Sequence, residues 1–350
     1  MRMFRNDYSE GAAPEVLEAL VATNYEQHVG YIEGDPHCER ARELIRAACG
    51  REDVAVEFSI GGTSTNLVCV SGMLRDWEGV ICTPDAHINT HETGAIAATG
   101  RTVLPTRDAD GFLSVEEAER VWRFQTGVGR HMTRPALIYI SNTTELGGVW
   151  DLARFDAICD WADERGLKVF LDGARLGSAL TSPAAKGLTL EHIARRCAAF
   201  YIGGTKNGLL FGEAVVIADP GLKEAFPFLI KERGGLMAKG RLLGVQFEAA
   251  FTQPADGGVA PYWRLARHAN ERAFRLREEL VGLGFEAYGD APSNQQFFAL
   301  DPAVAQHFAN EAGCEIFQEL PDGRLLTRFV CSWATTDADV DDVLELARSL

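Results

Sequence analysis

The sequence lacks several features that mark common protein classes. No two cysteines are spaced as Cys-x-x-Cys, and most of the eight cysteines stand singly inside apolar runs. This usage favours reduced, buried thiols over a disulfide framework. No apolar run approaches the roughly 18 residues of a membrane span, and the first residues contain no apolar core of a signal peptide. We therefore expect no membrane segment and a cytoplasmic location.

Positive charge is also scarce. The sequence has 34 lysines and arginines against 50 aspartates and glutamates, which gives a formal net charge of −16. Such a surface repels phosphate backbones and offers no polybasic face for anionic lipids. The composition argues against nucleic-acid and membrane partners and favours a soluble protein that its charge keeps apart from its neighbours.

No internal repeat or low-complexity segment interrupts the first two-thirds of the chain, where short apolar runs alternate with helical patterns. The expected strands are Val54–Phe58, Gly79–Cys82, Ala136–Ile140, Lys168–Leu171, Ala198–Ile202 and Ala214–Ile217. The expected helices between them are Thr63–Leu74, Ser114–Phe124, Leu152–Arg165 and Leu190–Arg196. Strands without polar alternation, separated by helices, predict an α/β domain with a mostly parallel central sheet.

The pattern changes at the Pro/Gly-rich stretch Thr252–Pro261. Beyond it we expect a helix reaching Leu280, short strands and a final helix. The expected strands are Phe285–Tyr288, Gln296–Leu300 and Leu325–Ser332, and the final helix is Asp337–Ser349. We therefore predict a large domain over residues 1–255 and a smaller α+β domain over residues 256–350.

One apolar run, Val169-Phe170-Leu171, ends in Asp172 and is followed by Gly173-Ala174-Arg175. Open α/β sheets bind ligands at the carboxyl ends of their strands. Asp172 could hold the ring nitrogen of pyridoxal phosphate (PLP) protonated, which makes that cofactor an electron sink. An aspartate that caps the next helix explains this segment equally well when it is taken alone.

A second apolar run, Phe200-Tyr201-Ile202, leads into Gly203-Gly204-Thr205-Lys206. A lysine near a bound phosphate and a positive ring nitrogen can lose its proton and form a Schiff base, whereas most lysines on turns are simply solvated. The spacing does not match a P-loop. Because one crossover helix fits between Asp172 and Lys206, the two strand ends can face one ligand, and together they favour PLP.

A candidate anion site lies at Gly61-Gly62-Thr63-Ser64, between an expected strand and an expected helix. Backbone N–H groups and hydroxyls at a helix N-terminus bind phosphate, although a simple Ser/Thr cap is the alternative. No G-x-G-x-x-G pattern is present here, which argues against a dinucleotide.

Two histidines, His87 and His91, are four residues apart and would share one face of a helix. An imidazole here can stack on a flat ring or act as a base near neutral pH. The spacing also suits zinc, but the H-E-x-x-H pattern is absent and we expect no metal site. A structural role is the simpler alternative for His91.

Three cationic side chains could bind anionic groups. Arg175 and Arg328 could each grip the carboxylate of an amino-acid substrate through two parallel hydrogen bonds. Lys231, before Gly234-Gly235, could reach a phosphate. A surface ion pair is the commoner explanation for any single one of them.

Taken together, these segments resemble the threonine aldolases, in the β-eliminating lyase branch of PLP fold type I (aspartate-aminotransferase-like). The likeness covers nearly the whole chain. It rests on Arg5-Asn6-Asp7-Tyr8-Ser9-Glu10-Gly11, Gly62-Thr63-Ser64-Thr65-Asn66, Ala86-His87, Asp172-Gly173-Ala174-Arg175, Gly203-Gly204-Thr205-Lys206-Asn207-Gly208 and Arg328-Phe329-Val330-Cys331-Ser332-Trp333.

The resemblance implies a role for each matching residue. These roles are the Schiff-base lysine (Lys206), the partner of the pyridine nitrogen (Asp172), the residue stacked on the ring (His87), the phosphate cradle (Gly62, Thr63, Ser64), the carboxylate grip (Tyr8 or Ser9, Arg175, Arg328) and a phosphate contact given to the neighbouring subunit (Lys231). We expect His87 or a bound water to accept the proton of the substrate hydroxyl, with His91 as the next candidate.

By this resemblance the chain is a PLP-dependent lyase that cleaves L-threonine, L-allo-threonine or a related β-hydroxy-α-amino acid to glycine and an aldehyde. Family members are dimers or tetramers with shared active sites. One departure is the run Ser141-Asn142-Thr143-Thr144-Glu145, where Thr144 replaces a histidine found in many members. Two rivals stay open: another PLP reaction (β-elimination or transamination) and a PLP fold retained as a binding protein.

Overall fold

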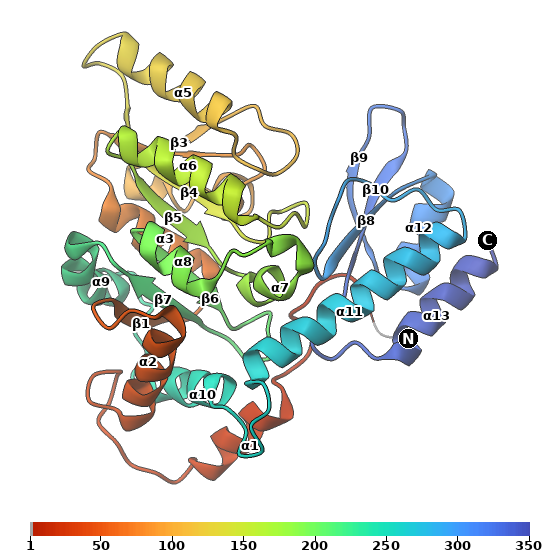
Figure 1. The fold of residues 1–350 in the computed structure, drawn as a ribbon, viewed down its shortest axis with the longest axis horizontal. Helices are drawn as coiled ribbons and strands as arrows, with labels where there is room; N and C mark the ends of the chain where they lie inside the picture. Colours follow the sequence, from red (N-terminus) through yellow and green to blue (C-terminus); the bar gives the residue numbers. More distant parts are fainter. Residues whose placement is uncertain (1–2) are drawn as a thin grey trace.

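The computed structural model describes residues 3–350, and its largest element is a seven-stranded sheet in the order β1-β7-β6-β5-β4-β2-β3 (Figure 1). Its strands are β1 (Ala55–Ser59), β2 (Glu78–Cys82), β3 (Thr102–Pro105), β4 (Arg134–Ser141), β5 (Lys168–Asp172), β6 (Ala199–Gly203) and β7 (Glu213–Ile217). Only β7 runs against its neighbours, β1 and β6. The expected mostly parallel α/β sheet is confirmed, with β3 as an unexpected edge strand.

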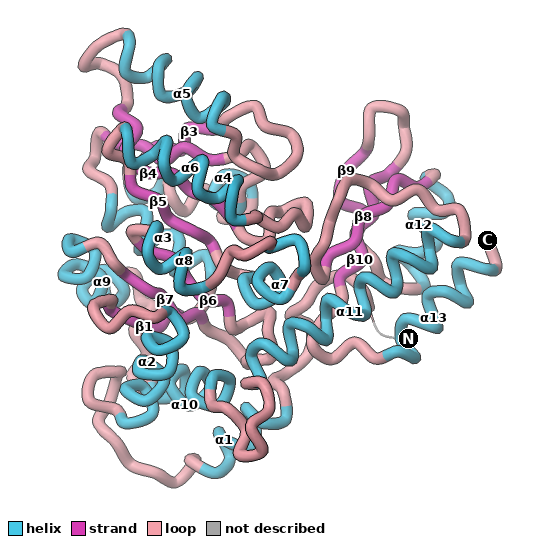
Figure 2. The backbone as a smooth tube through the Cα atoms, viewed as in Figure 1, coloured by secondary structure: helices cyan, strands magenta, loops and turns pink. Residues whose placement is uncertain are grey.

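Helices cover both faces of this sheet (Figure 2). The helices of this part of the chain are α1 (Pro14–Ala22), α2 (Pro36–Cys49), α3 (Gly62–Met73), α4 (His87–Thr90), α5 (Val115–Gly127), α6 (Leu152–Glu164), α7 (Leu176–Thr181), α8 (Leu190–Arg196), α9 (Pro220–Glu232) and α10 (Arg241–Phe251), with short 3₁₀ turns η1 (Ala97–Thr99) and η2 (Pro183–Ala185). Of these, α1 packs on α10 rather than on the sheet. Alternate residues of β4 enter different cores: Ile138 and Ile140 belong to the core that includes residues of α5 and α6, whereas Leu137 and Tyr139 belong to the core that includes residues of α3.

This double coverage explains why the central strands read as continuous apolar runs. Every residue of β2, β6 and β7 is buried. In β3, by contrast, Leu104 is the one buried residue, so the edge strand carries little apolar signal in the sequence.

The C-terminal part contains an antiparallel sheet in the order β8-β10-β9. Its elements are α11 (Pro261–Gly282), β8 (Gln295–Leu300), α12 (Pro302–Glu311), β9 (Glu315–Glu319), β10 (Leu325–Val330) and α13 (Asp337–Arg348). The strand expected at Phe285–Tyr288 forms only an isolated bridge, Ala287 to Phe298, because Gly289 turns the chain away with a φ of 60°. The division at residues 255 and 256 stays a prediction.

The N-terminal segment crosses to this C-terminal sheet. Phe4 lies in one core with residues of α11, α12 and α13. Its backbone N–H donates to Ala312 O at 3.0 Å, and its carbonyl accepts from Val330 N at 2.8 Å. Residues from the two ends of the chain are therefore joined beside β10.

All eight cysteines are unpaired and buried, as expected. Among residues 3–350, no helix is both long and apolar enough to cross a membrane.

Candidate active site

A cavity of about 500 Å³ opens where several strands of the large sheet end. Asp172 is the last residue of β5, and Gly203, the last of β6, precedes the loop that carries Lys206. Because β7 runs antiparallel, its first residue, Glu213, pairs with Gly203 and reaches the same edge. The C-terminal sheet supplies the opposite wall through Glu315, Phe317 and Arg328. The fold thus gathers polar groups from distant segments around one space.

Asp172 is almost fully buried and accepts hydrogen bonds at both carboxylate oxygens. Tyr139 Oη donates to Oδ2 at 2.5 Å, and Tyr201 Oη donates to Oδ1 at 2.5 Å. Asn66 Nδ2 and Ala174 N add bonds of 3.1 and 3.0 Å. Burial opposes ionisation, but the two tyrosine hydroxyls and the charge of His87 more than offset it, so the pKa of Asp172 is lowered. Asp172 is therefore an anion at neutral pH.

His87 is linked to this carboxylate through two further side chains. Its Nδ1 lies 2.7 Å from Glu92 Oε1, and Asn66 Nδ2 donates to the same oxygen at 2.7 Å while also bonding Asp172. Burial by itself would lower the pKa of His87. The hydrogen bond to Glu92 and the negative charge of Asp172 have a larger, opposite effect, so the pKa of His87 is raised. The chain of contacts holds the imidazole at the cavity, and His91 lies beside it with ring centres 5.6 Å apart.

Lys206 reaches the cavity from the turn after β6. Its Nζ lies 6.0 Å from the centre of the Tyr8 ring. Burial and the positive charge of Arg175 lower the pKa of Lys206 from its ordinary value, against the opposing effect of Asp7 and Glu145. A lysine in this environment more readily supplies the neutral amine that a nucleophile needs.

The N-terminus of α3 faces the same space. Gly61, Gly62 and Thr63 line the cavity. The first helical bond of α3 runs from Thr65 N to Gly61 O, so the N–H groups of residues 62–64 come before it and are available to an anion. A Cβ at Gly62 would lie 3.1 Å from Tyr201 Oη, so a side chain there would crowd the hydroxyl that donates to Asp172.

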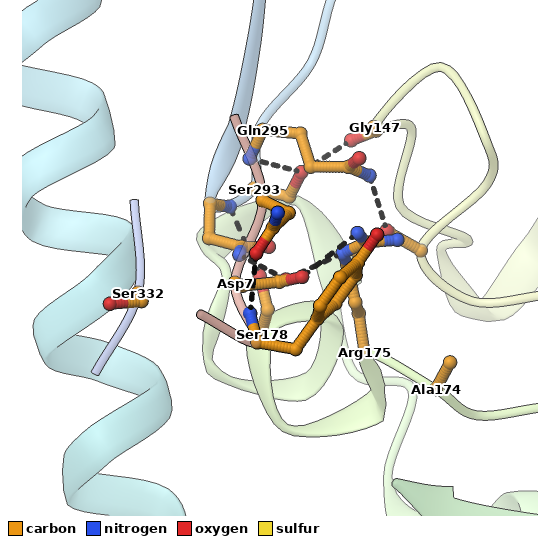
Figure 3. Close-up of polar contacts among 12 residues, drawn as sticks. Asp7, Gly147, Ala174, Arg175, Ser178, Ser293, Gln295 and Ser332 are labelled. Carbon is orange, nitrogen blue, oxygen red and sulfur yellow. Dashed lines mark hydrogen bonds and ion pairs between the residues drawn. The ribbon is translucent and has the colours of Figure 1, made fainter. Parts of the chain in front are cut away.

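Arg175 is positioned by a buried partner from the N-terminal segment. Its Nε and Nη2 donate to the two oxygens of Asp7 at 2.7 and 3.0 Å, and Asn294 Nδ2 donates to Asp7 Oδ2 at 2.9 Å (Figure 3). Burial raises the pKa of Asp7, but the charges of Arg175 and Lys206 outweigh it and hold that pKa at about 2. The salt bridge therefore persists across the working pH range.

Arg328 is held from the other sheet. It donates to Gln295 Oε1 at 3.0 Å and forms an ion pair with Glu315. The two arginines thus approach the cavity from β5 and from β10, and an anionic group between them would be bound by both parts of the chain.

Glu213 is a buried carboxyl group that faces the cavity. It accepts hydrogen bonds from Gly204 N at 2.9 Å and Thr205 Oγ1 at 2.8 Å, but burial dominates and raises its pKa to about 7. It therefore holds a proton in the folded protein over a pH range in which an exposed glutamate is ionised.

Replacement of Glu213 by glutamine should change how stability depends on pH. Between the ordinary pKa of 4.5 and about 7, the folded chain keeps a proton that the unfolded chain has lost, so wild-type stability falls as pH rises. Glutamine does not ionise. Unfolding of the cofactor-free proteins across this window should show the variant gaining on the order of 3 kcal/mol relative to wild type.

The exposed Glu224→Gln of α9 is the control and should follow wild type. A constant difference between Glu213→Gln and wild type from pH 4.5 to 7 would show that Glu213 titrates normally.

The structure brings together most of the residues that the sequence singles out. The cavity is lined by Tyr8, Gly62, Thr63, His87, His91, Asp172, Arg175, Lys206 and Arg328. Ser9, Ser64 and Lys231 do not line it; the Ser9 hydroxyl instead donates to Asn6 Oδ1 at 2.9 Å. Thr144 is buried and accepts from Gly148 N, so its neighbours Thr143 and Glu145 reach the cavity in its place.

The sequence patterns do not indicate the residues that hold the predicted site residues in place. Tyr139, Tyr201, Asn66 and Glu92 contact Asp172 or His87, and Asp7 fixes Arg175. Tyr201 stands in the quoted apolar run and Asn66 in the quoted helix start, but nothing in their spacing signals contact with Asp172.

The donor set suits a flat ring with a nitrogen, a carbonyl carbon and an anionic arm. A buried carboxylate can pair with the ring nitrogen, Lys206 can bind the carbonyl carbon, and the N-terminus of α3 can bind the arm. These are the groups that PLP offers, so the residues present fit that cofactor.

Several known proteins are similar to this chain in sequence, in fold or in both. A family model described as beta-eliminating lyase matches residues 4–313. The low specificity L-threonine aldolase of Pseudomonas sp. (strain NCIMB 10558) is 28% identical over 347 residues, covering 98% of this chain and 96% of that protein. A threonine aldolase structure from Leishmania major is 40% identical with a TM-score of 0.94, covering 100% of this chain and 99% of its own. Serine palmitoyltransferase of Sphingomonas wittichii shares the fold alone, with a TM-score of 0.72 and 15% identity over 100% of this chain and 86% of its own.

Proposed function

The chain belongs to the beta-eliminating lyase family, among the threonine aldolases, and from this premise we propose that it binds PLP and cleaves L-threonine, L-allo-threonine or a related β-hydroxy-α-amino acid to glycine and an aldehyde. Its fold is the expected PLP fold type I. One observation carries the proposal: Asp172, Lys206 and the N-terminus of α3 surround a single cavity.

When bound, PLP supplies an electron sink for the pair of electrons left at the α-carbon as its bond to the β-carbon breaks. Asp172 holds a proton on the ring nitrogen, because Tyr139 and Tyr201 keep this carboxylate ionised. Lys206 attaches the cofactor through an amine whose pKa is lowered by burial. His87, which Glu92 keeps in place at the cavity, would hold the ring from one side.

Arg175 and Arg328 orient the substrate by its carboxylate. Arg175 is rigid because Asp7 holds two of its nitrogens, and Arg328 is steadied by Gln295. A fixed carboxylate sets which bond of the α-carbon is broken, and such positioning lowers the barrier without new chemistry. His87 and His91 are the imidazoles at the cavity that can accept the proton of the β-hydroxyl.

The test is a product assay. The PLP-loaded protein is incubated with L-threonine, L-allo-threonine and L-phenylserine, and glycine and aldehyde are measured alongside ammonia and 2-oxo acid. Glycine and aldehyde in equal amounts are expected, and the three rates rank the β-substituents. Ammonia and 2-oxo acid without glycine would replace this proposal by β-elimination (dehydration) at the same Lys206, whereas 2-oxo acid without ammonia or glycine would indicate transamination.

We also propose that the protein is a cytoplasmic homodimer or homotetramer with shared sites. Lys231 supports this, because it lies outside its own chain's cavity, in a separate cleft where its Nζ is 4.8 Å from the centre of the Tyr31 ring. A neighbouring subunit could receive this lysine as a phosphate contact. A solution mass equal to one chain would overturn the proposal.

A further inference from the structure

A second cluster of ionisable side chains lies outside the cavity, in the segment that joins α1 to α2. Glu26 and His28 stand in this loop, and His37 is in the first turn of α2. The Nε2 atoms of His28 and His37 lie 2.9 and 2.8 Å from the same atom, Glu26 Oε2. Two imidazole nitrogens and one carboxylate oxygen therefore converge on one point.

A fourth residue fixes the orientation of one imidazole. His37 Nδ1 lies 2.6 Å from Glu248 Oε2 of α10. In the tautomer whose Nδ1–H donates to Glu248, His37 presents its unprotonated Nε2 towards the cluster. Metal-binding histidines characteristically use their second nitrogen in this way, to a carboxylate that fixes the ring and strengthens the ligand.

The cluster is also open on one side. Glu26 and His28 line a cleft of about 430 Å³, which also carries two cationic residues, Lys239 and Arg241. The side chains of Glu26 and His28 are 42% and 26% exposed, whereas His37 is 18% exposed. A bound ion could be reached by solvent, which would complete its coordination.

We propose that Glu26, His28 and His37 bind a zinc ion, with Glu248 holding His37 and water as the fourth ligand. Two imidazoles and a carboxylate suit Zn²⁺ and its tetrahedral geometry. The three ligand atoms all lie within 4.8 Å of one another. Bonds of about 2.0–2.1 Å would place them about 3.3 Å apart, so Glu26 Oε2 needs to withdraw by only ~0.5 Å from each imidazole nitrogen.

The consequence of such an ion would be structural. It would tie the loop over residues 23–35 to α2 and, through Glu248, to α10. The same loop donates from Tyr31 N to Ala238 O at 2.8 Å and carries the ring that faces Lys231. The ion would therefore hold in place the segment that carries Tyr31, next to Lys231.

The experiment is a calorimetric titration of the metal-free holoenzyme with Zn²⁺, repeated on single variants. We expect one ion per chain, a higher melting temperature with Zn²⁺, and loss of this binding in His28→Gln and in His37→Gln. Glu248→Gln keeps the three ligands and should weaken binding by about 10–100-fold. His131→Gln removes an exposed histidine of the loop after α5 and should bind as wild type does.

His28→Gln alters an exposed loop side chain, so it keeps the test valid if His37→Gln does not fold. Substitution with Co²⁺ adds a spectroscopic measurement, because four-coordinate and six-coordinate Co²⁺ have different visible spectra. The proposal is overturned if no ion binds, or if His28→Gln and His131→Gln bind Zn²⁺ equally well. In either case the cluster is only a set of ion pairs between carboxylates and imidazolium groups.

Discussion

Replacement of Lys206 by alanine should abolish turnover of β-hydroxy amino acids. Lys206 supplies the buried amine at the cavity, and its lowered pKa comes from burial and from Arg175. Alanine offers no nitrogen to attach the cofactor, and water in its place cannot do so. The measurement is glycine release from L-threonine by the PLP-loaded variant, together with borohydride reduction, which should leave the cofactor attached covalently to wild type only.

A suitable control is Lys239→Ala, since Lys239 is an exposed lysine outside this cavity. It should turn over substrate at the wild-type rate. Sustained glycine release by Lys206→Ala with PLP would show that another residue carries the cofactor.

The second large effect is expected for Asp172→Asn. Asparagine has the shape of aspartate but no charge, so it cannot keep a ring nitrogen protonated. Its amide group would also face the hydroxyl of Tyr139 or Tyr201, both of which now donate to Asp172. Loss of one preorganised electrostatic contact at a reacting centre typically costs about 10²–10³-fold in kcat, and we expect at least that loss here.

The variant Asn66→Ala tests whether the loss of rate comes from the charge of Asp172 or from its hydrogen-bonded surroundings. This variant removes one hydrogen bond to Asp172 and one to Glu92 but leaves the carboxylate and both tyrosines, so kcat should fall much less. Steady-state rates at saturating PLP compare the two variants. If Asp172→Asn retains wild-type kcat, the carboxylate serves only to anchor the fold.

The ends of the buried strands were predictable because burial on both sheet faces leaves a continuous apolar run, and a polar residue that closes such a run is conspicuous. Asp172 and Lys206 were found in this way. The orientation of β7 was not predictable, because parallel and antiparallel central strands are equally apolar, so the position of Glu213 at the same edge went unnoticed.

The residues that support the site carry no such signal. Tyr139 and Tyr201 read as ordinary core aromatics, and only their neighbours in space reveal that both hydroxyls meet one carboxylate. His28 and His37 are separated by most of a loop, and Glu248, the second partner of His37, lies more than two hundred residues further along. Proximity of this kind depends on tertiary packing rather than on spacing in the sequence.

The crossing of the N-terminal segment to the C-terminal sheet has a consequence for biosynthesis. The backbone of Phe4 is hydrogen-bonded to Ala312 and Val330. Asp7, three residues further along, holds Arg175 in place. During translation the strands β1 to β7 emerge first and can form their sheet on the ribosome. The segment before α1 cannot take its place until β10 has been synthesised. A nascent chain with a complete large sheet therefore still lacks Arg328 and Asn294, which donates to Asp7, so the full set of groups at the substrate site is present only late in synthesis.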